Sequence, residues 1–182
     1  MPRCIAFLRA VNVGGHTVKM AELTRIFGSL GLAEVGTFSA SGNVIFARPA
    51  AGSAALAPRL EAALEQELGY PVAVFLRDET ELQALVRKRP FPEARMRAAP
   101  TLVAAFLKQP LTAEQLQRLE ALRSSVDDFA VDGRELFWSC RVKQSESGFS
   151  NALLEKRLGI QTTFRSFSTL LRLAERLSQD RR

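Results

Sequence analysis

Apolar residues in the first part of the chain follow the pattern of a strand and then that of a helix. Residues 4–8 are continuously apolar, which predicts a buried strand. A helix is predicted over 19–30, and Gly31 is typical of the position just after a helix. The apolar residues that recur there at helical spacing are Met20, Leu23, Ile26, Phe27 and Leu30.

Two short strands, a second helix and a further strand continue this half. The strands are predicted over 34–39 and 43–47, and residues 40–42 join them as a tight hairpin turn. The helix over 53–68 has leucines four residues apart, and the strand over 71–76 follows it.

Asp78 is predicted to cap one more short helix, because Glu81 stands three residues later as in a capping box. The order of elements is then βαββαβ with a trailing helix, which is the ferredoxin-like pattern. In that fold the first two strands are parallel, and the third lies between them and antiparallel to both.

The alternation of strands and helices restarts at residue 102. In chain order it predicts a strand over 102–107, a helix that Thr112 caps with Gln115, strands over 129–131 and 135–140 joined by Asp132-Gly133, a helix over 151–158, a short strand over 161–164 and a helix over 168–178. Phe137 and Trp138 are adjacent on one of these strands. One of them is therefore expected in the core, and the other is a candidate for exposure.

The chain is accordingly expected to be an α+β protein of two ferredoxin-like (βαββαβ) halves, each an antiparallel sheet covered by helices. The first half spans 1–88 and the second 101–182. Residues 89–100 are rich in proline and arginine and show little periodicity, so they are interpreted as a linker or a surface excursion.

The composition adds a core and a basic charge to this picture. Hydrophobic residues make up 47% of the 182, which is ample for a core. The net charge of +6 favours anionic partners such as nucleic acid or phosphorylated metabolites. The arginines are scattered along the chain, so the codon preference of a GC-rich genome is an alternative explanation of the charge.

The two cysteines, Cys4 and Cys140, do not form a CxxC pair and are expected to be buried free thiols in a reducing cytosol. The apolar stretch 4–8 is too short for a signal peptide, and no apolar run approaches the length of a membrane span. We expect a soluble cytoplasmic protein with no contact to a membrane.

Polar residues are expected to converge at one end of the first sheet. The connection rule brings the loop after the first strand and the hairpin after the second to the same end. The connection before the fourth strand lies there too. That end gathers Arg9, Asn12, His16, Lys19, Ser39, Ser41, Asn43 and Tyr70.

Glycines, a helix start and a lysine make this end a candidate anion site. Gly14 and Gly15 precede the helix, whose free N–H groups and dipole favour an anion beside Lys19. The alternative is structural: the glycines make a tight turn, and Asn12 bonds to the loop backbone. In the second half, Lys143 and Arg141 are further candidates for holding an anion near a helix start.

No catalytic constellation is recognisable in the sequence. His16 is the only histidine; it is a candidate general acid or base, although a solvated loop histidine is the simpler interpretation. No P-loop, dinucleotide motif or cluster of metal ligands occurs, so neither a metal nor a cofactor is expected. The sequence therefore does not decide whether the protein is an enzyme.

Several segments in order resemble the bacterial domain-of-unknown-function family 1697. They are 9–15 (RAVNVGG), 19–23 (KMAEL), 41–46 (SGNVIF) and the C-terminal residues from Thr163 to Glu175. The family has no established reaction, but its motifs coincide with the loop and the hairpin of the candidate site. The departures from its usual motifs are Ala10 for glycine, Ala40 for glutamine, Ser166-Phe167-Ser168 for Asn-Trp-Asn, and Asn151 for a lysine.

Three functions follow from these observations. The first, which we favour, is binding of a small anionic or phosphorylated ligand by Arg9, Asn12, Gly14, Gly15, Lys19, Ser41, Gly42 and Asn43. The second is an RNA- or DNA-binding module with a basic surface, although no RNP1-like motif is present. The third is a structural or interaction module whose strand edges pair with a partner or with a second copy.

Overall fold

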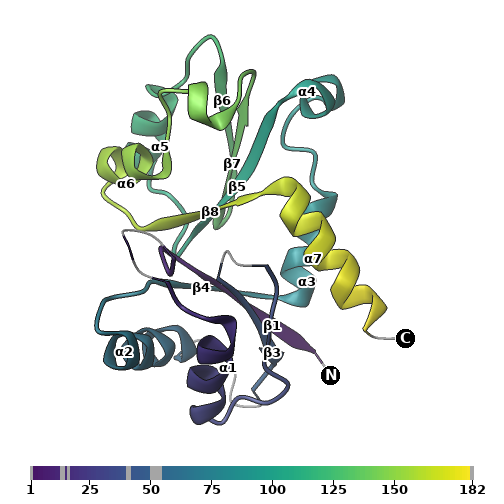
Figure 1. The fold of residues 1–182 in the computed structure, drawn as a ribbon. Helices are drawn as coiled ribbons and strands as arrows, with labels where there is room; N and C mark the ends of the chain where they lie inside the picture. Colours follow the sequence, from purple (N-terminus) through teal and green to yellow (C-terminus); the bar gives the residue numbers. More distant parts are fainter. Residues whose placement is uncertain (1, 13–14, 16, 40–41, 50–54, 181–182) are drawn as a thin grey trace. The chain divides into compact units, whose positions relative to one another are not determined.

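The computed structural model of the 182-residue chain describes residues 2–12, 15, 17–39, 42–49 and 55–180. The chain forms two compact units, one of residues 1–85 with 177–182 and one of residues 86–176. Each contains a four-stranded antiparallel sheet with helices packed on it (Figure 1). The expected α+β fold with two similar halves is confirmed.

The first unit has the strand order β2-β3-β1-β4, with every pair antiparallel. This is the order that the ferredoxin-like pattern requires. Its elements are β1 (Arg3–Leu8), α1 (Met20–Ser29), β2 (Gly36–Thr37), β3 (Asn43–Ala47), α2 (Leu56–Leu68), β4 (Val74–Asp78) and α3 (Glu79–Arg87).

Helices α1 and α2 lie side by side against one face of this sheet (Figure 1). Alternate residues of β1 face them and are buried, beginning with Cys4. The helices contribute residues spaced three and four apart, such as Leu23 and Phe27 in α1 and Leu60 and Leu64 in α2. The apolar spacing read from the sequence is therefore the spacing that builds this core.

The second unit repeats the arrangement with the strand order β6-β7-β5-β8. Its elements are α4 (Glu93–Ala98), β5 (Thr101–Leu107), α5 (Ala113–Glu120), β6 (Asp127–Asp132), β7 (Glu135–Cys140), the 3₁₀ helix η1 (Gln144–Glu146), α6 (Asn151–Leu158), β8 (Thr162–Ser166) and α7 (Phe167–Gln179).

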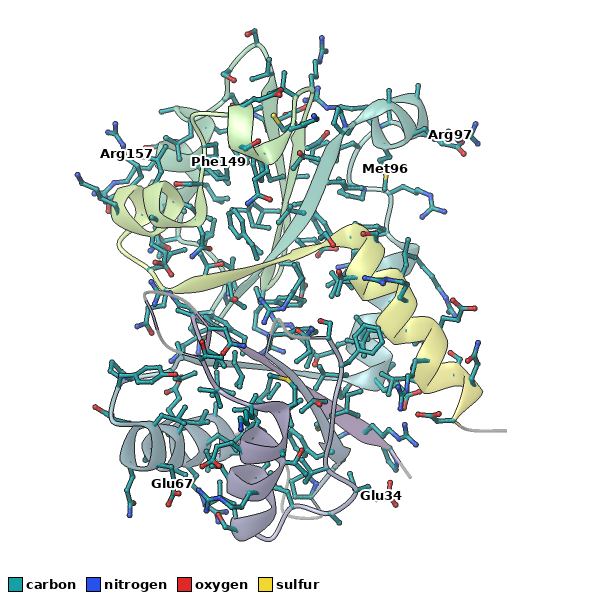
Figure 2. The ribbon with its side chains drawn as sticks, in the orientation of Figure 1. Glu34, Glu67, Met96, Arg97, Phe149 and Arg157 are labelled. Carbon is teal, nitrogen blue, oxygen red and sulfur yellow. The ribbon has the colours of Figure 1, made fainter. Side chains whose placement is uncertain are left out.

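Aromatic rings form the centre of the second core. The Phe149 ring, labelled in Figure 2, lies with its centroid 4.7 Å from that of Phe129 and 4.9 Å from that of Trp138. Phe137 and Trp138 are both buried, at 1% and 0% exposure. Neither residue of the pair is exposed, because both faces of β7 are covered.

Local sequence signals set most of the helix ends. Asp78 and Glu81 exchange side-chain and backbone hydrogen bonds of 2.8 Å at the start of α3, as a capping box predicts. Thr112 and Gln115 form the same motif at α5. Cys4 and Cys140 are buried and free of disulfides, as expected. No described helix is long and apolar enough to span a bilayer.

Two segments differ from the sequence interpretation. The strand expected over 34–39 is reduced to the two residues of β2. Residues 89–100, expected to be a linker or a surface excursion, contain the helix α4. Pro92 is the N-cap residue of this helix. Proline is compatible with a helix start because it lacks only an N–H that the first turn leaves unbonded.

Candidate functional site

The loop after β1 and the β2–β3 hairpin meet at one end of the first sheet. The backbone N–H of Leu8 donates to the carbonyl oxygen of Gly42 over 2.8 Å. The N–H of Arg9 donates to the carbonyl of Ala73, just before β4, over 2.9 Å. The Tyr70 hydroxyl donates to the carbonyl of Val11 over 3.0 Å. Three connections that are far apart in the sequence are thus bonded together here.

Two asparagine side chains hold the backbone of this end. Oδ1 of Asn12 accepts a hydrogen bond of 2.7 Å from the N–H of Val18 and so closes the loop before α1. Asn43 is fully buried, and its Nδ2 donates to the carbonyl of Phe38 over 2.9 Å and to Oγ of Ser39 over 3.2 Å. These amides shape the loop and the hairpin that the candidate site is built from.

Left-handed backbone conformations flank the junction. Gly42 has φ +70°, and a Cβ added there would lie 3.2 Å from Cβ of Leu8. Ala10 and Ser39 adopt φ values of 59° without being glycine. Such residues are strained unless their surroundings hold them, and they are often found at functional sites. The family that the sequence resembles usually has glycine at the position of Ala10. A left-handed φ explains that preference, because glycine has no Cβ and adopts this conformation without strain.

Lys19 provides positive charge at the start of α1. It occupies the N-cap position, and its exposed side chain makes no capping hydrogen bond. The N–H groups of that turn and the helix dipole add to the positive potential. Gly15 is exposed with φ +88°, and Arg9 is half-buried. Of the remaining predicted residues, Gly14, Ser41 and His16 lie outside the described part of the chain.

A cavity of about 410 Å³ lies next to Lys19 and carries both signs of charge. Arg25 donates to Glu22 over 2.7 Å and also bonds Glu67, which is labelled in Figure 2. The hydrogen bond from Arg25 lowers the pKa of Glu22. The cavity is lined by Thr17, Val18, Lys19, Glu22, Glu67, Leu68 and Tyr70.

The sequence interpretation missed a larger groove of about 710 Å³ in the second unit. Its lining comes from segments far apart in the chain, and Lys143 alone among these residues was a candidate for binding a ligand from the sequence. The cationic residues there are Arg89, Arg97 and Lys143. A signal that favours this place is the arginine-rich segment 89–100, which was interpreted as a linker or a surface excursion. Among the described residues no group of three metal-ligating side chains occurs.

The comparisons with known proteins agree with this fold. The conserved bacterial protein SP0830 from Streptococcus pneumoniae is similar in structure, with a TM-score of 0.74. The two sequences are 23% identical, and the match covers 96% of this chain and 97% of that one. None of the curated proteins compared matches the chain. The family model described as "Protein of unknown function (DUF1697)" matches residues 1–137. The chain therefore belongs to the DUF1697 family.

Proposed function

We propose that the protein binds a small anionic ligand, such as a phosphorylated metabolite, where the loop after β1 meets the β2–β3 hairpin. The observation that carries this proposal is the exposed Lys19 at the N-cap position of α1. Unbonded N–H groups and a cation at a helix start are a common environment for phosphate oxygens.

The other residues of the proposed site have distinct roles. Arg9 and Lys19 contribute charge, and the backbone at Gly15 and Gly42 approaches the ligand without a side chain in the way. Gly14 and Ser41 belong to the proposed site by their place in the sequence and lie outside the described residues. Asn12 and Asn43 act indirectly, because their amides are bonded to Val18 and Phe38 and so keep the loop and the hairpin in place. Preformed sites of this kind bind with less loss of conformational entropy.

The neighbouring carboxylates limit where an anion sits. Glu22 and Glu67 share Arg25, which offsets part of their negative charge. We therefore place the ligand against Lys19 and the start of α1 rather than toward the carboxylates. A cytoplasmic location completes the proposal, since two buried free thiols suit a reducing compartment.

Isothermal titration with inorganic pyrophosphate tests the site. A charge-assisted hydrogen bond contributes about 1.5–3 kcal/mol, so Lys19→Ala should weaken binding roughly tenfold or more. Lys156→Ala is the matched control, because Lys156 is also an exposed lysine but lies on α6 in the second unit. Equal affinity of the two variants, or no binding by the wild type, would contradict the proposal.

Filter binding with single-stranded RNA over a range of salt concentrations separates this proposal from nucleic-acid recognition. A module that neutralises many phosphates loses affinity steeply as salt increases. Tight RNA binding with a steep salt slope that Lys19→Ala leaves unchanged would favour the nucleic-acid alternative. Light scattering at two protein concentrations addresses the interaction-module alternative by its self-association.

A further inference from the structure

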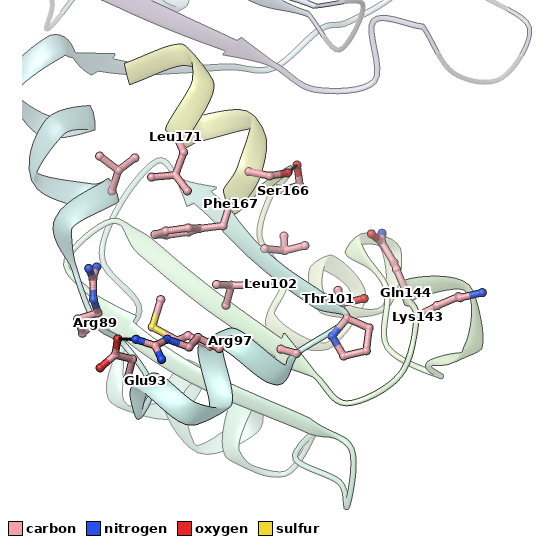
Figure 3. A pocket seen from close by; sticks show the side chains of 16 residues that line it. Arg89, Glu93, Arg97, Thr101, Leu102, Lys143, Gln144, Ser166, Phe167 and Leu171 are labelled. Carbon is pink, nitrogen blue, oxygen red and sulfur yellow. Dashed lines mark hydrogen bonds and ion pairs between the residues drawn. The ribbon is translucent and has the colours of Figure 1, made fainter. Parts of the chain in front are cut away.

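The groove of about 710 Å³ lies wholly within the second unit (Figure 3). Helix α4 and residues 99–103 form one side of it, and the start of α7 forms another. Lys143 and Gln144, at the beginning of η1, close one end. A space of this volume is in the range of sites for drug-sized molecules.

Side-chain bonds hold the walls of the groove. Arg95 of α4 donates from Nε to Oγ of Ser139 over 3.2 Å and pairs with Asp128 at 3.0 Å. Oγ1 of Thr101 donates to the carbonyl of Val142 over 3.1 Å and so fixes the segment that carries Lys143. The groove is therefore preformed, and a ligand need not order it.

The middle of the groove is apolar. Leu102 lies on one side, and the side chains of Phe167 and Leu171 lie opposite it (Figure 3). Met96 of α4 adds a flexible apolar surface. Leu171 is 47% exposed; among the described residues only Leu116, at 39%, is another large exposed hydrophobic residue. An apolar body placed here would cover side chains that water now contacts.

Both ends of the groove are polar. One end has charged side chains of both signs, and the other has a lysine. Arg89 and Arg97 lie at one end, where Arg97 is ion-paired with Glu93 (Figure 3). Lys143 lies at the other end beside Gln144, and Ser166, the last residue of β8, lines the groove between this end and Leu171 (Figure 3). Among the described residues that line the groove, Glu93 is the only acidic one. Among the described lining residues, the Lys143 end thus has a cation and no carboxylate.

We propose that this groove binds an amphipathic organic anion: a small molecule with an aromatic or aliphatic body and one phosphate or carboxylate group. The body lies on Leu102, Phe167 and Leu171, and the anionic group lies at the Lys143 end. This site is separate from the one proposed around Lys19 and does not depend on it.

Titration with 1-naphthyl phosphate, compared with its two halves, tests the chemistry. Inorganic phosphate supplies the charge alone and 1-naphthol the apolar body alone. Burying a naphthyl ring and pairing the phosphate act together, so the whole probe should bind at least about tenfold more tightly than either half. Equal affinity of the probe and one half would overturn the proposal, as would no binding of the probe.

Two matched pairs of variants then locate the site. Lys143→Ala and Leu171→Ser should each weaken binding of 1-naphthyl phosphate by about fivefold or more. Lys156→Ala and Leu116→Ser remove another exposed lysine and another exposed leucine outside the groove and should leave the affinity unchanged. All four positions are on the surface, and circular dichroism verifies the fold of each variant.

Equal effects within either pair would place the probe elsewhere and overturn the proposal. Lys19→Ala distinguishes the two proposed sites, because it should weaken pyrophosphate binding and leave 1-naphthyl phosphate binding unchanged. Loss of naphthyl phosphate binding in Lys19→Ala, with full binding in Lys143→Ala, would contradict the groove assignment.

Discussion

The indole Nε1–H of Trp138 donates a hydrogen bond of 2.9 Å to Oδ1 of Asp127 inside the second unit. Ser147 donates to the same oxygen over 2.9 Å, and Ser124 donates to Oδ2 over 2.8 Å. One buried carboxylate therefore joins the turn before β6, the strand β7 and the segment that follows η1. That segment begins four residues after Lys143, so the network supports one end of the groove.

We expect Asp127 to make the stability of the protein sensitive to acid. Burial raises the pKa of this carboxyl, but hydrogen bonds from Cys140, Trp138, Ser124 and Ser147 outweigh burial and lower it. The folded pKa then lies below the unfolded value of about 3.9. The stabilisation is complete above the unfolded pKa and is lost as the pH falls through the folded pKa.

Urea unfolding between neutral pH and pH 3 measures this effect. Asp127→Asn should lower the free energy of unfolding at pH 7 by about 1–3 kcal/mol, and the difference from the wild type should shrink in acid. Asp132→Asn is the control. Asp132 is the last residue of β6, and its carboxylate is exposed to solvent, unlike that of Asp127. A difference between Asp127→Asn and wild type that stays constant with pH would contradict this assignment.

Replacing Ala10 by glycine should stabilise the protein. Ala10 has φ 59°, a left-handed conformation that costs a residue with a Cβ about 1–2 kcal/mol. We expect Ala10→Gly to raise the free energy of unfolding by up to about 1 kcal/mol. Ala62→Gly, at an exposed position inside α2, should instead lower it by about 1 kcal/mol. Destabilisation by both changes would show that Ala10 is not strained.

Gly42→Ala should be more destabilising than Gly69→Ala, although both glycines are left-handed. Their φ values are +70° and +79°, so the conformational cost of a Cβ is similar. Only at Gly42 would the new Cβ meet a neighbour, Cβ of Leu8 at 3.2 Å. The added crowding should cost about 1–3 kcal/mol beyond the loss in Gly69→Ala. Chemical denaturation measures both variants, and equal losses would contradict the close approach.

Asn43→Ala should destabilise the hairpin as well as any ligand site built on it. Removing its buried amide leaves the carbonyl of Phe38 without this donor, at a cost of about 1–3 kcal/mol. Lys19→Ala should leave the free energy of unfolding nearly unchanged, since Lys19 is exposed. Comparing the two variants by thermal unfolding and by pyrophosphate titration separates loss of fold from loss of a ligand contact.

Arg95→Met should loosen helix α4. The change keeps an apolar stem over the Phe91 ring but removes the bonds to Ser139 and Asp128. Amide exchange in α4 should become faster, and the unfolding free energy should fall by about 1–3 kcal/mol. Arg97→Met is the control on the same helix, because Arg97 is largely exposed and its pair with Glu93 contributes little. Similar exchange in the two variants would argue against an anchoring role for Arg95.

Most of the fold was predictable because its signals are local or periodic. The apolar spacing of α1 and the capping pairs Asp78–Glu81 and Thr112–Gln115 define elements without reference to the rest of the chain. The order of these elements then fixes the antiparallel sheets and brings the loop after β1 to the β2–β3 hairpin. Helix α4 was missed because Pro90, Pro92 and its arginines resemble a linker when read without their contacts.

The sequence by itself determined the two βαββαβ halves, the positions of the capping residues and the junction of loop and hairpin, because periodicity and strand connections are properties of the chain order. Only the tertiary structure decided that Asp127 is buried beneath Trp138 and that both faces of β7 are covered. It also brought Arg89, Lys143 and Leu171 to one groove. Asp127 and Trp138 are 11 positions apart in the chain, and the groove residues are farther apart still. These relationships arise only when packed elements place such side chains together.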